Sequence, residues 1–313
     1  MIALLTDRCL ITIALAGVGL LAYGNSKDSA HTGLPHDSFW RAKMAMVGTA
    51  DVVACGDSRV YRGVDPDGLS SSGEFDVVVN FGFSGVGFSA DYLEATRGIL
   101  SASGSKVIVL GITPHSLTPS AVARNGFNDY RPWYGKPLRA WQIRIAEYKE
   151  TYAPIRFQTF RNALSSTVDK PTRLKTHYFQ NGFAARPASG FDERMNAKTL
   201  QHYRSIFESN KVSDSLVSGV FEFCRDCQSH GILVAGFRPP TTDEMEAIEN
   251  SSSGFSEPEF VSAFEQAGGL WLDIQTDDLG TFDSSHLDAE SAIVFSRRIG
   301  DALKIHLEKR ERE

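Results

Sequence analysis

The sequence predicts an α/β fold built on a mainly parallel five-stranded sheet. Five short apolar runs are continuous rather than alternating, as expected for parallel strands that are buried on both faces. These runs are 51–55, 75–80, 106–111, 231–237 and 269–274. Helical patterns lie between several of them, at 90–101, 213–229, 257–267 and 289–308. Strands and helices in alternation, joined by right-handed crossovers, predict a three-layer α/β/α sandwich.

Composition is consistent with one large domain. The chain has 313 residues, of which 42% are hydrophobic, and this supplies enough apolar material for a sizeable core. The formal net charge is −6 and no basic stripe runs along the sequence. This charge pattern argues against nucleic acid as the main partner.

One interval interrupts the alternation of strands and helices. Residues 113–210 contain no convincing core strand and are rich in aromatic and basic residues. A stretch of this length is too long for a simple loop, so we expect an inserted, largely helical subdomain or lid. It leaves the end of the third strand, at the sheet edge where open α/β proteins bind ligands. The main domain is expected over 46–310, after a polar stretch at 26–45 that is predicted to be a linker or a first surface helix.

The first 25 residues differ from the rest. Cys9–Tyr23 is an uncharged, mainly apolar stretch of 15 residues that follows Arg8. Three interpretations stay open: a signal peptide cleaved after Gly24, an uncleaved signal-anchor, which we favour, or a buried helix of a soluble domain. An anchor leaves the domain attached to the membrane in the periplasm or outside the cell, whereas cleavage makes the protein secreted. Both place the body of the protein outside the cytoplasm.

The four cysteines do not form a recognisable framework. Cys224 and Cys227 make a C-x-x-C pair, but it lies within a helical pattern and lacks a second pair. A zinc site needs four ligands, so we expect no metal, and nothing in the sequence calls for a cofactor.

Three short segments carry the chemistry. Gly-Asp-Ser at 56–58 follows the first predicted strand, Asn-Phe-Gly-Phe-Ser-Gly at 80–85 follows the second, and Asp-Ser-Ser-His at 283–286 precedes the last helix. A serine after one strand, a glycine turn after the next and a late Asp-x-x-His are the parts of a serine hydrolase. Ser58 is the predicted nucleophile, His286 its base, and Asp283 the residue that orients the base. An alternative role for Asp283 is a cap on the last helix.

The order and context of these segments resemble the SGNH (GDSL-like) hydrolase and acyltransferase superfamily, over most of the chain after about residue 50. The resemblance implies a flavodoxin-like SGNH fold. It also implies three donors to a developing oxyanion: the backbone N–H groups of Ser58 and Gly85, and an asparagine side chain after the third strand.

The third donor departs from the family pattern. Where the family shows Gly-x-Asn-Asp, this chain reads Gly-Ile-Thr-Pro-His at 111–115. Thr113 occupies the asparagine position and offers a hydroxyl of shorter reach; His115 is the alternative donor. Arg238 follows the fourth strand, where it either binds a substrate carboxylate or phosphate or forms a salt bridge to the insertion.

Two functions follow as hypotheses. The first is an extracytoplasmic serine esterase or O-acyltransferase that acts on acyl esters of a carbohydrate or cell-envelope polymer through an acyl-enzyme. In layout the chain is similar to membrane-attached acyl-transfer proteins of polysaccharide and cell-wall modification, which implies an envelope-modification complex as partner. The second is a catalytically weak or inactive SGNH-like scaffold that binds polysaccharide through the aromatic residues of the insertion.

Overall fold

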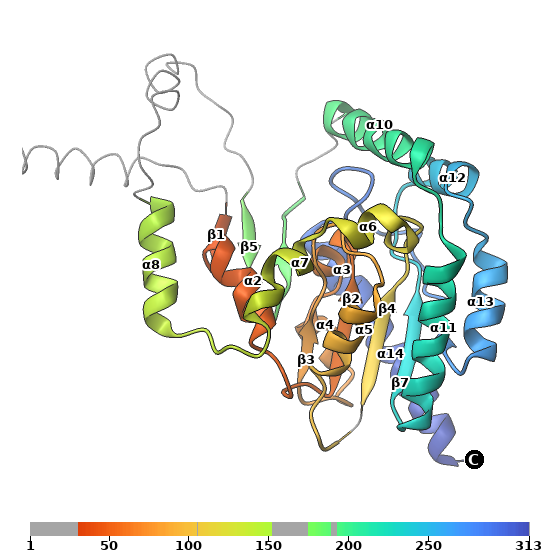
Figure 1. Cartoon of the computed structure of the whole chain (residues 1–313), viewed down its shortest axis with the longest axis horizontal. Coiled ribbons are helices and arrows are strands. Elements are labelled where there is room, and N and C mark those ends of the chain that lie inside the picture. Colours follow the sequence, from red (N-terminus) through yellow and green to blue (C-terminus); the bar gives the residue numbers. More distant parts are fainter. Residues whose placement is uncertain (1–30, 105, 152–174, 189–192, 313) are drawn as a thin grey trace, which may run out of the picture.

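The computed structural model describes residues 31–104, 106–151, 175–188 and 193–312 (Figure 1). The expected signal-anchor or signal peptide at 1–25 lies outside these residues, as does the central part of the insertion. Within the described ranges, none of the helices combines the length and the hydropathy that a bilayer-spanning segment needs.

A five-stranded sheet forms the centre of the molecule, and all of its strands pair in parallel. The strand order is β3-β2-β4-β7-β8. This confirms the prediction of an α/β fold with a mainly parallel five-stranded sheet. The strands are β2 (Val52–Gly56), β3 (Val78–Asn80), β4 (Val107–Gly111), β7 (Leu233–Phe237) and β8 (Leu270–Trp271).

The register brings the carboxyl ends of the central strands together. Gly56 at the end of β2 is paired with Gly111 of β4, and Gly111 is paired with Phe237 of β7. Residues that follow these strands therefore meet at one edge of the sheet. Ser58, Thr113 and Arg238 all follow these ends, which is why one edge collects most of the predicted site.

Alternate side chains of the strands enter two hydrophobic clusters, one on each face. On β2, Val53 and Cys55 belong to one cluster, and Val52 and Ala54 to the other. The first cluster includes side chains of α5 (Ala90–Arg97), α11 (Asp214–Ser229) and α13 (Glu257–Gln266). The second includes side chains of α3 (Ser58–Gly63), α4 (Pro66–Ser70) and α14 (Ala289–Arg312).

The C-x-x-C pair lies inside α11. Cys224 and Cys227 are buried free thiols in the first cluster. Burial raises the pKa of each thiol to about 12, so both stay protonated at neutral pH. Their surroundings are those of structural cysteines.

The described part of the insertion holds helices of 3 to 17 residues and two strands of a second, small sheet. Strand β1 (His31–Gly33) pairs in parallel with β5 (Thr176–Tyr178), and β5 pairs antiparallel with β6 (Ala184–Ala185). Sequence analysis did not predict this sheet. The helical elements are η1 (His115–Leu117), α6 (Pro119–Ala123), α7 (Gly126–Tyr130), η2 (Arg131–Trp133), α8 (Ala140–Thr151) and α10 (Glu193–Ser209).

The range expected as a linker or a first surface helix, 26–45, contains helix α2 (His36–Met44) in its described part. Phe39, Lys43 and Met44 of this helix are fully buried, so α2 is a component of the core. A helix that the sequence did not predict, α12 (Asp243–Ser252), follows β7. In Figure 1, α6, α10 and α12 lie at the upper end of the sheet, where β2, β4 and β7 end.

Candidate active site

A sharp turn between β2 and α3 presents Ser58. Gly56 has φ +147°, and a Cβ there would lie 2.5 Å from Val60 Cγ2 and 2.8 Å from the carbonyl oxygen of Gly111. Only glycine fits this turn. Asp57 then caps α3, because its carboxylate accepts a hydrogen bond of 2.9 Å from the backbone N–H of Arg59. Ser58 is the first residue of the helix.

Three side chains form a hydrogen-bonded series across the sheet edge. Ser58 Oγ lies 2.7 Å from His286 Nε2. On the other side of the ring, His286 Nδ1 lies 3.0 Å and 2.9 Å from the two carboxylate oxygens of Asp283. With the proton on Nδ1, Asp283 accepts it and Nε2 is free to accept the Ser58 hydroxyl proton. This is the geometry that activates a serine.

The loop that carries Asp283 and His286 is held in an unusual conformation. Ser284 has φ +67°, the one positive value among the described non-glycine residues. Such backbone strain clusters at functional sites. Asp283 accepts two backbone N–H groups as well, from Ser285 at 3.1 Å and from His286 at 2.9 Å. The carboxylate therefore fixes both the histidine ring and the loop beneath it.

Asp283 stays ionised in this environment. Burial alone raises the pKa of its carboxyl group, but the adjacent His286 and the hydrogen bonds outweigh burial and bring the pKa below its ordinary value. An ionised Asp283 stabilises the imidazolium that forms when His286 takes a proton.

The segment after β3 lies against the Ser58 turn. The backbone N–H of Phe83 donates to the carbonyl oxygen of Gly56 over 3.0 Å. The Asn80 side chain donates to the carbonyl oxygens of Val60 and Val64, at 2.8 and 2.6 Å, and so ties the segment to α3. Gly85 ends it with φ +60°, a conformation that favours glycine.

A buried lysine that sequence analysis missed supports the same segment. Lys43 Nζ donates to the carbonyl oxygen of Gly82 over 2.6 Å, and its side chain is fully buried. Burial lowers the pKa of this amine well below its ordinary value. Aromatic rings surround it, with Nζ between 4.8 and 5.5 Å from the ring centroids of Phe39, Trp40, Tyr61 and Phe83. No local pattern distinguishes Lys43 from a surface lysine of α2.

Thr113 does not offer its hydroxyl to an oxyanion. The side chain is fully buried, and its Oγ1 donates to Asp57 Oδ2 over 2.7 Å. A hydroxyl has a single proton to donate. The expectation that Thr113 replaces the asparagine donor is therefore not met; Thr113 instead fixes the residue before the nucleophile.

His115, two residues later, lies beside Gly85, one of the expected oxyanion donors. A Cβ built on that glycine would be 3.9 Å from His115 Cε1. Its Nδ1 is 4.0 Å from Asp57 Oδ2, and 14% of the side chain is exposed. Burial, assisted by the charge of Arg59, lowers the pKa of His115. The ring is thus neutral at pH 7 and carries one N–H to donate.

Arg238 is held by carboxylates of the main domain rather than by the insertion. Its guanidinium contacts Glu257 over 2.6 Å and Glu249 over 2.9 Å. These ion pairs occupy the group that was expected to bind a substrate anion. Arg238 therefore does not join Ser58, His286 and Asp283 as an available side chain.

Glu249 connects Arg238 to the catalytic loops. It also accepts a hydrogen bond of 2.7 Å from Arg59, the residue after Ser58. Arg59 Nε in turn donates to Ser285 Oγ over 3.0 Å. Burial raises the pKa of Glu249, but the two arginines outweigh it and lower the pKa overall. Sequence analysis missed this series of linked ion pairs and hydrogen bonds, because Glu249 and Arg59 are 190 positions apart.

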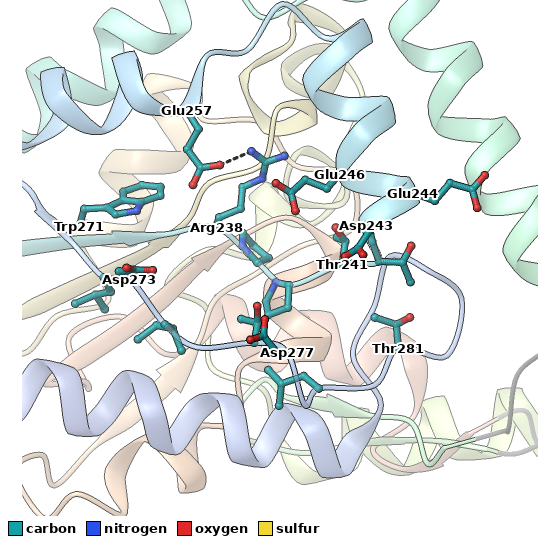
Figure 2. Close-up of a pocket in the computed structure, with 17 residues that line it drawn as sticks. Arg238, Thr241, Asp243, Glu244, Glu246, Glu257, Trp271, Asp273, Asp277 and Thr281 are labelled. Carbon is teal, nitrogen blue, oxygen red and sulfur yellow. Dashed lines mark hydrogen bonds and ion pairs between the residues drawn. The ribbon is translucent and has the colours of Figure 1, made fainter.

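A separate cavity of about 710 Å³ opens where β7 and β8 end (Figure 2). Figure 2 shows Arg238 directed toward Glu257, with Trp271 and several carboxylates, among them Asp243 and Asp273, around it. No residue of the Ser58 series lines this cavity. In the described part of the chain, no group of His, Cys, Asp and Glu residues is arranged to hold a metal ion.

No family model, curated protein or solved structure matches this chain. The functional argument therefore rests on the residues and their geometry.

Proposed function

We propose that the chain is a serine esterase or O-acyltransferase of the SGNH type, with a three-layer α/β/α sandwich of the flavodoxin-like kind. One observation carries the proposal. Ser58 Oγ, His286 and Asp283, from opposite ends of the sequence, form a continuous hydrogen-bonded series at the carboxyl edge of the sheet. A structural role for Asp283 as a helix cap does not account for the contact between His286 and Ser58.

The reaction proceeds by double displacement. Ser58 Oγ attacks the ester carbonyl carbon while its proton moves to His286 Nε2, and Asp283 stabilises the imidazolium. When the tetrahedral intermediate collapses, the alkoxide leaves with the proton from His286, and an acyl-enzyme remains. Water or a sugar hydroxyl then gives its proton to His286 and attacks the acyl-enzyme, which releases an acid or a new ester. The choice of acceptor decides between hydrolysis and transfer.

Three donors serve the oxyanion in this proposal. Two are the backbone N–H groups of Ser58 and Gly85, which the family pattern supplies. The third is the N–H of neutral His115, in place of the asparagine that is missing. Its position beside Gly85 supports this role, and Thr113 is committed to Asp57.

The proposed substrate is an acyl ester of a carbohydrate or cell-envelope polymer, outside the cytoplasm. Support comes from the layout: an apolar N-terminal stretch, an SGNH-like body and an inserted segment after the third strand. Among the aromatic residues of the insertion, Phe127 is buried and packs in the core, whereas Trp133 is 38% exposed, with the Arg41 guanidinium 3.8 Å from its ring centroid.

The second candidate is a polysaccharide-binding scaffold without efficient catalysis. The observation that favours it is the fully buried Thr113 at the position of the family asparagine. In that case, the Ser58 series is retained but lacks a competent third donor.

Turnover of a small acetyl ester distinguishes the two candidates. We expect Ser58→Ala and His286→Ala each to abolish nearly all activity, and the double variant to be scarcely worse, because residues that act as a unit are strongly non-additive. Ser262→Ala and His230→Ala, which change exposed residues on other elements, are the matched controls. Ester turnover that survives in Ser58→Ala contradicts the proposed mechanism.

A further inference from the structure

Helix α8 has apolar side chains on its outward face. The inner face of α8 packs against the rest of the protein, since Ala146 is buried and Ile143 contacts the first hydrophobic cluster. Trp141 and Ile145 are 55% and 46% exposed. They are four positions apart and therefore share one face of the helix. A surface helix normally presents polar residues there.

The exposed apolar residues are concentrated in this region. Of the seven large hydrophobic side chains that are exposed in the described residues, three are Trp133, Trp141 and Ile145. Scattered exposed apolar residues need no explanation, but a concentration of them marks an interaction site. Helices α8 and η2 both pack against α2, so the three side chains belong to one side of the molecule.

The charge of the same region is opposite to that of the chain. Residues 131–147 contain four basic residues and one acidic residue, whereas the whole chain has a net charge of −6. Arg144 is exposed and lies three positions after Trp141, next to the apolar face. Tryptophan beside arginine and lysine on an apolar helix face is typical of segments at a membrane surface with anionic lipids.

The apolar stretch Cys9–Tyr23 is close in sequence to β1, which lies on this side of the molecule. Cys9–Tyr23 ends eight residues before His31, the first residue of β1. Eight residues span at most about 28 Å when fully extended. Figure 1 shows β1 and α2 beside α8, at the left edge of the molecule. A segment inserted in a bilayer just before β1 therefore holds α8 close to the lipid surface.

We propose that the outward face of α8, formed by Trp141, Arg144 and Ile145, docks on an anionic membrane surface. The indole and the isoleucine enter the interface, and Arg144 pairs with lipid phosphates. The proposal is independent of the esterase chemistry. In this orientation, the carboxyl edge of the sheet, at the top of Figure 1, faces parallel to the membrane surface rather than toward it or away from it.

The test uses the full chain in vesicles of phosphatidylcholine and phosphatidylglycerol, some of whose lipids carry brominated acyl chains that quench tryptophan. Trp40 is buried and Trp271 packs within the fold, so lipid quenching should come from Trp141 and Trp133. We expect Trp141→Phe to remove roughly half of the quenching. Trp271→Phe is the control and should leave it unchanged.

A second pair of variants checks the same face without removing a fluorophore. Ile145→Asp should reduce the quenching of Trp141, whereas Ile305→Asp, which changes an exposed isoleucine of α14, should not. Quenching that does not change in Trp141→Phe and Ile145→Asp overturns the proposal. The face of α8 is then covered by water, by another segment of the chain or by a protein partner. Native circular dichroism in these variants shows that the fold is intact.

Discussion

Asp283 determines which nitrogen of His286 faces Ser58. Its two carboxylate oxygens are 3.0 and 2.9 Å from His286 Nδ1. Asp283→Asn can donate a proton at that position and thus favours the wrong tautomer of the histidine. We expect turnover of an acetyl ester to fall by about 10⁴-fold, less than in Ser58→Ala. Steady-state kinetics on variants with native circular dichroism measure this, and an Asn variant as active as the wild type contradicts the assigned role.

His115 takes the place of the missing asparagine donor in the proposed mechanism, and a single substitution tests this role. If its N–H stabilises the oxyanion, His115→Ala should lower kcat by about 10²–10³-fold and leave KM almost unchanged, because the contact forms only in the transition state. The control is His230→Ala, at a histidine whose side chain is 61% exposed. If His115→Ala lowers thermal stability as well as kcat, the loss of activity reflects lost packing, and His115 is assigned a packing role instead.

Lys43 couples stability to pH. Burial lowers the pKa of its amine in the folded state, while the unfolded state keeps the ordinary value of 10.5. Between these two values the unfolded state binds more protons, so the free energy of unfolding should rise with pH. Urea denaturation from pH 7 to pH 9 should show that this rise is reduced in Lys43→Met and kept in Lys198→Met, which changes an exposed lysine of α10. Identical slopes in the two variants refute the coupling.

The residues that the sequence could locate are those whose position follows from strand order. Ser58 follows the end of β2 by two residues and Gly85 follows the end of β3 by five, while Asp283 and His286 are three positions apart, so local patterns find all four. The bond between Thr113 and Asp57 joins positions 56 apart in the sequence. Spacing alone cannot show that a hydroxyl is committed to a distant carboxylate, and the same holds for Lys43.

At the scale of elements, buried ion pairs join α3, α12, β7 and α13. Glu249, with its side chain fully buried, contacts both Arg59 and Arg238. Glu249→Gln leaves the buried Arg59 and the partly buried Arg238 short of a partner, and this should cost about 3–5 kcal/mol in the free energy of unfolding. On the same helix, Glu244 pairs with Arg204 at the surface, and Glu244→Gln should cost at most about 1 kcal/mol. If urea denaturation gives the same loss in free energy of unfolding for both variants, the ion pairs of Glu249 stabilise the fold no more than a surface pair does.

The long elements were predictable because each carries its own periodic pattern. The five core strands and helices α5, α11, α13 and α14 agree with the predicted ranges within a few residues. The small sheet of β1, β5 and β6 was not predictable, since its strands are only two or three residues long and β1 pairs with β5 across 145 positions. A surface helix was one of the two predictions for the range that holds α2, but its burial was not predictable, because its buried face includes Lys43, which a hydropathy pattern counts as exposed.

For the whole molecule, the apolar stretch Cys9–Tyr23 is the segment proposed to determine location. If Cys9–Tyr23 directs export, a reporter fused after residue 45 should be active outside the cytoplasm, and inactive there once residues 1–25 are deleted. High-salt washing then separates a membrane anchor, which is retained, from a cleaved signal peptide, which is not. Equal cytoplasmic activity of both fusions is the outcome that contradicts this topology.

The central claim is that Ser58 is an activated nucleophile, and covalent labelling tests it most directly. The full chain is treated with a fluorophosphonate, digested, and analysed by peptide mass spectrometry. The account predicts one stoichiometric adduct on Ser58, lost in Ser58→Ala and strongly slowed in His286→Ala, with Ser262→Ala labelled like the wild type. Absence of an adduct on Ser58 in the folded wild-type protein, or equal labelling of the His286→Ala variant, would contradict it.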